Sequence, residues 1–135
     1  HIFFQERWYG FDDGLYAAAR LVEILANQPD DADTFLARFP QDIGTPEINI
    51  AVTDANKFSL VDKLAREGDF GEGIKTTLDG IRVDYQDGWG LCRASNTTPA
   101  LVMRFEGKSA AALARIKTVF NDALTRIAPE IELPQ

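Results

Sequence analysis

The segment Arg93-Ala94-Ser95-Asn96-Thr97-Thr98-Pro99 holds the densest group of side chains that could do chemistry. An arginine guanidinium is a permanent planar cation whose N–H groups match two oxygens of one phosphate. Ser95, Thr97 and Thr98 add hydroxyl donors, while Asn96 adds an amide group. A tight polar turn can also point successive backbone N–H groups at one anion. A second interpretation stays open, in which this is a solvated turn whose hydroxyls bond their own backbone.

Alternating strands and amphipathic helices must position this segment. Alternation of apolar residues predicts a strand over 47–52. Further strands are predicted over 74–78, 81–85, 89–94 and 99–105, with Asp79-Gly80 and Asp87-Gly88 as hairpin turn signals between them. Apolar residues at spacings of three and four predict two helices, one from Thr53 or Asp54 to Gly68 and one from Lys108 or Ser109 to Pro129. The polar segment then connects two neighbouring strands. We expect an α+β domain, an antiparallel sheet with both helices packed on one face, because that arrangement buries both apolar stripes.

Residues 1–40 have a different pattern. An aromatic start, which includes Trp8, Tyr9 and Phe11, predicts a strand, and we expect these rings to lie in a core. Asp12 or Asp13 is suited to cap a helix that ends near Asn27. A short helix closed by Pro40 and a turn-rich segment follow. We therefore expect two domains, with residues 1–40 as a remnant of a preceding α/β domain and residues 41–135 as a C-terminal domain.

Composition limits the classes of partner. Lysine and arginine number 14 against 21 acidic residues, so the formal net charge is −7. Nucleic acid and anionic membranes are bound through clustered positive charge, so we expect neither as a partner. No apolar run approaches the roughly 20 residues that span a bilayer. The single cysteine, Cys92, cannot form an internal disulfide, which favours a reducing, cytoplasmic location, and we expect it to be buried.

Several segments together resemble one enzyme family. Arg93-Ala94-Ser95-Asn96-Thr97-Thr98-Pro99 is similar to the phosphate-binding loop of the α-D-phosphohexomutases, and is nearest to the bacterial phosphomannomutase/phosphoglucomutase type. Residues 6–14 resemble the segment that follows the sugar-recognition loop of that family. Thr45-Pro46-Glu47-Ile48 and Thr77-Leu78-Asp79-Gly80 also fall where the family has them. The resemblance covers essentially the whole chain.

The resemblance implies that this chain is part of a larger enzyme. Members of the family have four domains, and this chain corresponds to the end of the third, sugar-binding domain and to a TBP-like fourth domain. The phosphoserine and the aspartate loop that binds Mg²⁺ lie in other domains, so no cofactor or metal is expected in this chain. The fragment alone is expected to be inactive. Residues 40–46 correspond to the hinge between the two domains.

The resemblance also assigns ligands. The family interconverts hexose 1-phosphate and 6-phosphate through a 1,6-bisphosphate, with mannose or glucose as the sugar. Arg93, Ala94, Ser95, Asn96 and Thr97 would bind the phosphate that is not being transferred, with Thr98 as a further contact. His1 corresponds to the last residue of the sugar loop, which makes it a substrate contact and a candidate general acid or base. The other domains of the parent enzyme would be its protein partners. The alternative is a non-catalytic regulatory or docking module in which the polar turn is merely solvated.

Overall fold

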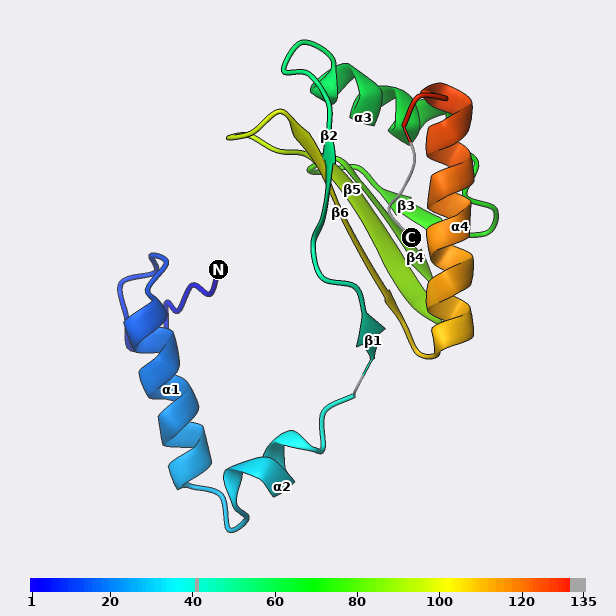
Figure 1. Ribbon diagram of the computed structural model, residues 1–135. Coiled ribbons are helices and arrows are strands. Elements are labelled where there is room, and N and C mark those ends of the chain that lie inside the picture. The colour runs from blue at the N-terminus through cyan, green and yellow to red at the C-terminus, as the bar shows by residue number, and fades with distance from the viewer. Residues whose placement is uncertain (41, 132–135) are drawn as a thin grey trace. The chain divides into compact units, whose positions relative to one another are not determined.

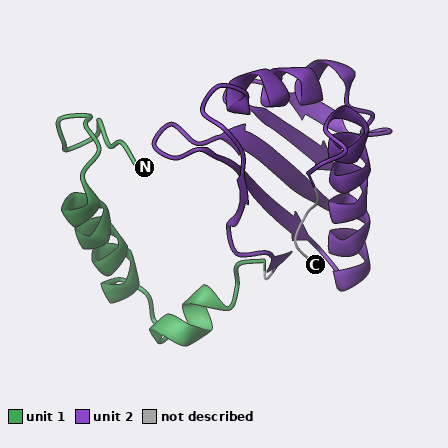
Figure 2. Ribbon diagram, turned by 45° about the horizontal axis from the view of Figure 1, so that its top comes forward, with its two compact units in different colours: residues 1–41 green, residues 42–135 purple. Residues whose placement is uncertain are grey.

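The computed structural model describes residues 1–40 and 42–131, which divide into two compact units (Figure 2). The first unit covers residues 1–41 and the second covers residues 42–135. Each unit is described by itself. Within the described residues, no helix is both long enough and apolar enough to cross a membrane.

The second unit is built on one antiparallel sheet of six strands (Figure 1). The strand order is β1-β6-β5-β4-β3, and β2 also pairs with β6. The longest ladder joins β5 to β6 and sets Arg93 opposite Val102. The strands are β1 (Ile43–Gly44), β2 (Ile48–Ala51), β3 (Ile74–Thr76), β4 (Ile81–Tyr85), β5 (Gly88–Ala94) and β6 (Ala100–Gly107).

Two helices of the second unit, α3 (Lys57–Glu67) and α4 (Ala110–Ile127), pack against the sheet and against each other on one face (Figure 1). The fully buried side chains of the core come from both layers: Leu64, Ile81, Val83, Cys92, Leu101, Met103, Phe105, Ile116, Phe120 and Leu124. Alternation along the strands explains this, because every second residue points at the helices. The predicted sheet with two helices on one face is confirmed.

A glycine in β5 allows α4 to lie close to the sheet. A Cβ atom added at Gly90 would lie 2.4 Å from Cε2 of Phe120, which is inside van der Waals contact. The Phe120 ring also contacts Phe70 and Phe105, with centroid separations of 4.8 and 5.3 Å. Gly90 therefore fixes the separation between α4 and β5, and with it the position of β5, which carries Arg93.

The first unit contains α1 (Gly14–Ala26) and α2 (Ala32–Leu36). Asp13 caps α1 through a hydrogen bond from the backbone N–H of Tyr16, as the sequence predicted. The strand expected at the aromatic start is reduced to one bridge between Phe3 and Asp12. A strand needs a neighbouring strand to satisfy its backbone groups, and residues 1–40 supply no other.

The expectation that the N-terminal aromatic rings lie in a core is wrong for this unit. Tyr9 is 83% exposed and Phe11 is 52% exposed. Instead, the rings pack on one another, and Trp8 stacks on Tyr16 at a centroid distance of 4.2 Å. Helix α1 has no buried residue. A core requires two packed layers, and this unit has only one layer of helices.

Smaller differences concern the ends of elements. Helix α3 begins at Lys57 instead of Thr53 or Asp54, with Asn56 at its N-cap. The strand predicted over 74–78 ends at Thr76, and Leu78 is 95% exposed. Strand β1 was not predicted, because its two residues are too few to show alternation.

Candidate anion site

The candidate loop connects β5 to β6 and begins on the face of the sheet that the helices leave open. Cys92 and Ala94 point into the core, so Arg93 between them points to the opposite face and is only partly buried. A surface hollow lies beside this arginine. Its lining residues come from the loop, from β6 and from the start of β2: Glu47, Asn49, Arg93, Ser95, Thr97, Thr98, Ala100 and Val102.

Arg93 differs from the other arginines in its contacts. Most of them pair with a carboxylate, such as Arg82 with Asp84 at 2.7 Å and Arg104 with Glu106 at 3.0 Å. Within residues 1–40 and 42–131, no hydrogen bond or ion pair is found for the Arg93 guanidinium. In a chain of net charge −7, an arginine without an acidic partner is an available cation. Its five N–H groups are therefore free to bind an anion.

Ser95 is the centre of the loop. It is only 7% exposed, and its hydroxyl oxygen accepts hydrogen bonds from the backbone N–H of Thr98 at 3.1 Å and of Thr97 at 3.3 Å. The Thr98 hydroxyl lies at 2.8 Å from the same oxygen. Two successive N–H groups thus converge on one oxygen, as an anion nest requires, but that oxygen belongs to Ser95. The solvated-turn interpretation predicts this part of the geometry equally well, but it gives no reason for the unpaired Arg93.

The remaining loop residues have different environments. Ala94 is 6% exposed and its side chain belongs to the core, so only its backbone N–H could bind an anion. Asn96 is exposed and does not line the hollow. The structure therefore brings Arg93, Ser95 and Thr97 together on one hollow, joined there by Thr98.

Sequence reasoning missed Lys57, which lies at the base of the loop. Its Nζ donates to the Thr98 carbonyl at 3.1 Å and pairs with Asp54 at 2.7 Å. The side chain is 6% exposed. A signal was present in the sequence, because Lys57 is four residues before Val61 and seven before Leu64 and so falls on the apolar face of the helix. The contact itself joins residues 41 apart and could not be read from spacing.

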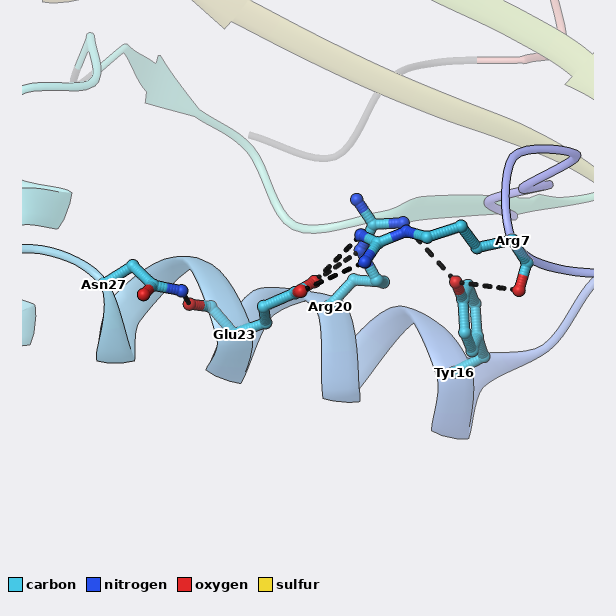
Figure 3. Close-up of polar contacts among 5 residues, drawn as sticks. All are labelled: Arg7, Tyr16, Arg20, Glu23 and Asn27. Carbon is cyan, nitrogen blue, oxygen red and sulfur yellow. Dashed lines mark hydrogen bonds and ion pairs between the residues drawn. The ribbon is translucent and has the colours of Figure 1, made fainter.

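The N-terminal segment with the second resemblance forms a separate polar cluster (Figure 3). Arg7 donates to both carboxylate oxygens of Glu23, at 3.2 and 3.1 Å, and Arg20 Nε lies 2.9 Å from the same carboxylate. The bond from Arg7 holds the pKa of Glu23 below its usual value. Arg7 has φ of 62°, a strained conformation for a residue with a side chain. His1 is exposed and contacts the Asp12 carboxylate through Nδ1. The structure thus ties His1 to the start of α1.

Two other predictions concern metal and thiol chemistry. Among the residues that the structure describes, no three His, Cys, Asp or Glu side chains are grouped so that they could hold a metal ion. Cys92 is fully buried, as expected, and desolvation raises the pKa of its thiol to about 12. Such a thiol stays protonated and is a poor nucleophile at neutral pH.

Comparison with known proteins identifies the family. The family model described as "Phosphoglucomutase/phosphomannomutase, C-terminal domain" matches residues 47–123. The phosphomannomutase/phosphoglucomutase of Pseudomonas putida is 61% identical over 134 residues, which are 99% of this chain and 29% of that protein. The protein of the same name from Pseudomonas aeruginosa PAO1 is 54% identical over the same share of both chains.

A solved structure shows the same relationship. The X-ray structure of a phosphoglucomutase/phosphomannomutase family protein from Burkholderia thailandensis superposes with a TM-score of 0.87 at 48% identity, over all of this chain and 28% of that one. The fold is thus that of a C-terminal domain from a multidomain enzyme. The chain belongs to the phosphoglucomutase/phosphomannomutase family. It spans less than a third of the length of the relatives that it matches.

Proposed function

We propose that this chain is part of an enzyme that interconverts hexose 1-phosphate and hexose 6-phosphate, with mannose or glucose as the sugar. The reaction would pass through a hexose 1,6-bisphosphate. In this proposal the loop from Arg93 to Thr97, with Thr98 as a further contact, binds the phosphate that is not being transferred. Family membership supports the reaction class, since the Pseudomonas relatives are named phosphomannomutase/phosphoglucomutase.

The observation that carries the proposal is the unpaired Arg93 beside a set of neutral donors. A bidentate guanidinium supplies charge and geometry for two phosphate oxygens. The two lone pairs of the Ser95 oxygen are already shared among three donors of the loop, which leaves the Ser95 hydrogen to donate, either to a ligand or to the Thr97 hydroxyl at 3.5 Å. Thr97 lines the same hollow. Arginine and hydroxyl donors recognise the phosphate dianion but read nothing of the sugar attached to it.

A loop that recognises phosphate without recognising the sugar suits a reaction that passes through a bisphosphate intermediate. Between the two half-reactions the intermediate must turn around, so the distal phosphate is carried first by one end of the hexose and then by the other. A loop that grips only phosphate accepts both orientations. Binding energy gained at this remote phosphate can also drive domain closure and orient the reacting end. The proposed hinge is residues 40–46; within that range Ile43 and Gly44 pair with β6 in the second unit, and residue 41 lies outside the described residues.

The remaining elements of the proposal lie outside the loop. His1 is proposed as a substrate contact and as a candidate general acid or base, because an imidazole ring can both donate and accept a proton. Mg²⁺ is proposed for the parent enzyme, held by a domain outside this chain, where it would neutralise charge on the transferring phosphoryl group. We also propose a cytoplasmic location, supported by the buried and unpaired Cys92.

Arg93→Ala tests the proposal in the 135-residue chain. We expect the native chain to bind mannose 1-phosphate with a dissociation constant on the order of 1 mM, about −4 kcal/mol, because only part of the site is present. Arg93→Ala should abolish this binding in a calorimetric titration. Arg126→Ala is the matched control, since Arg126 is 68% exposed and its contact with Asp69 is long, at 3.8 Å. Equal binding by the native chain and Arg93→Ala would refute the proposal.

A further inference from the structure

Lys57 is a buried lysine in an unusual place. Its side chain is 6% exposed at the first residue of α3, beneath the loop that follows β5. The ammonium donates to the Thr98 carbonyl at 3.1 Å and pairs with Asp54 at 2.7 Å. Asp54 is itself 74% exposed, so water screens that side of the pair.

Two physical effects work against a lysine at this position. Removing an ammonium group from water is costly unless its hydrogen bonds are replaced. The N-terminus of a helix also carries a partial positive charge, which disfavours a cation there. Methionine would fill the same space without either cost. The placement of Lys57 is therefore poorly explained by the stability of α3 alone and points to its other contact, the Thr98 carbonyl.

The Thr98 carbonyl lies at a junction of the loop. It accepts the backbone N–H of Ala100 at 2.9 Å as well as the Lys57 ammonium. The N–H and hydroxyl of Thr98 both donate to the Ser95 oxygen, at 3.1 and 2.8 Å. When Thr98 is held in place, its N–H and hydroxyl donors hold the Ser95 oxygen. The direction in which the Ser95 hydroxyl can donate is then also set.

Resting on the proposed function, we infer that Lys57 is a positioning residue for the phosphate-binding loop. It acts through Thr98 and does not touch the phosphate, because it is almost fully buried and two of its three N–H groups have protein acceptors. Its ammonium ties the start of α3 to the loop and holds the loop in its binding conformation before the ligand arrives. Preorganisation of this kind raises affinity because binding no longer has to order the loop.

The test compares Lys57→Met with Lys75→Met in the 135-residue chain. Lys75 is the matched control: its Nζ also donates to a backbone carbonyl, that of Gly68 at 2.8 Å, but it lies on β3 at the far edge of the sheet. We expect Lys57→Met to weaken the binding of mannose 1-phosphate about tenfold, the effect of losing one hydrogen bond to a charged group. Lys75→Met should bind as the native chain does.

Amide hydrogen exchange without ligand supplies a second readout. Lys57→Met should speed exchange at Thr97, Thr98 and Ala100, where loosening of the loop exposes N–H groups, while Lys75→Met should leave these amides unchanged. A lysine that only stabilised the second unit as a whole would change exchange throughout that unit and not at the loop alone. Lys57→Gln, which is neutral and too short to reach Thr98, is the second variant and should give the same result if Lys57→Met fails to fold.

The outcomes separate this inference from the proposed function. If Arg93→Ala abolishes binding while both Lys57 variants bind like Lys75→Met, the inference is overturned and the proposed function stands. If Arg93→Ala binds normally, the proposed function fails and the role of Lys57 fails with it. Loss of binding in Arg93→Ala together with weakened binding and faster loop exchange in Lys57→Met supports both.

Discussion

Replacing Ser95 by alanine should both destabilise the second unit and weaken phosphate binding. The Ser95 oxygen accepts from the backbone N–H groups of Thr97 and Thr98 and from the Thr98 hydroxyl. Alanine removes the shared acceptor and the hydroxyl that we propose as a phosphate donor. The substitution leaves the small side chain buried in nearly the same space, so packing changes little.

The size of the stability loss in Ser95→Ala depends on how far the groups that donate to Ser95 are exposed to water. Three hydrogen bonds at about 1 kcal/mol each would give an upper value near 3 kcal/mol. Thr97 and Thr98 are exposed, however, so water can satisfy their N–H groups after the substitution. We therefore expect Ser95→Ala to lower the free energy of unfolding by about 1–2 kcal/mol. With a urea dependence of about 1–3 kcal/mol per molar, the midpoint should fall by roughly 1 M.

The assay is a urea titration followed by NMR through the indole N–H of Trp89, which lies in the second unit. Ser59→Ala is the matched control, because its exposed hydroxyl donates to the Asn56 carbonyl on the surface of α3, and it should stay within about 0.5 kcal/mol of the native chain. Mannose 1-phosphate should bind Ser95→Ala at least tenfold more weakly. The reasoning is wrong if Ser95→Ala matches Ser59→Ala in both stability and binding.

Two further predictions concern the core. Gly90→Ala should cost about 1–3 kcal/mol, since the new Cβ would lie 2.4 Å from the Phe120 ring, whereas Gly14→Ala meets no atom within 4 Å and should change little; equal denaturation midpoints would contradict this. Burial raises the pKa of the Cys92 thiol from 9.0 to about 12. Between these two pH values the thiol of the unfolded chain loses its proton, while the thiol of the folded chain keeps it. The contribution of the thiol to the stability of the folded state is therefore complete below about pH 9. Above that pH, the free energy of unfolding should fall by up to about 1.4 kcal/mol per pH unit. Urea titrations at pH 8 and 10 should show that the free energy of unfolding decreases less between these pH values in Cys92→Ala than in the native chain. Identical decreases in the two proteins would rule out the thiol as the cause.

The sequence predicted the elements whose residues repeat with a clear period. Burial alternates along β4 and β5, β6 carries the apolar run Leu101-Val102-Met103, and α4 has an apolar stripe over 18 residues. Ser109 at the start of α4 accepts the N–H of Ala112, which is the capping that its residue type favours. Local chemistry of this kind can be read without knowledge of the fold.

Contacts between distant residues could not be predicted in the same way. The link from Lys57 to Thr98 depends on the end of β2 and the loop after β5 lying together, where the N–H of Val52 donates to the Pro99 carbonyl. The role of Ser95 as an acceptor within its own loop depends on the path of the backbone, which residue types alone do not fix. The exposure of Tyr9 was missed because aromatic residues predict a core only when a second layer is present to cover them.

The central claim is that the loop from Arg93 to Thr98 binds phosphate and ignores the sugar. Its most direct test follows the backbone amide shifts of the isotope-labelled chain during titration with mannose 1-phosphate, glucose 1-phosphate, and unphosphorylated mannose and glucose. We predict shifts centred on Arg93 to Thr98 with both phosphates, with similar dissociation constants on the order of 1 mM, and none with the free sugars. Shifts elsewhere, or equal responses to phosphorylated and free sugars, would contradict the claim.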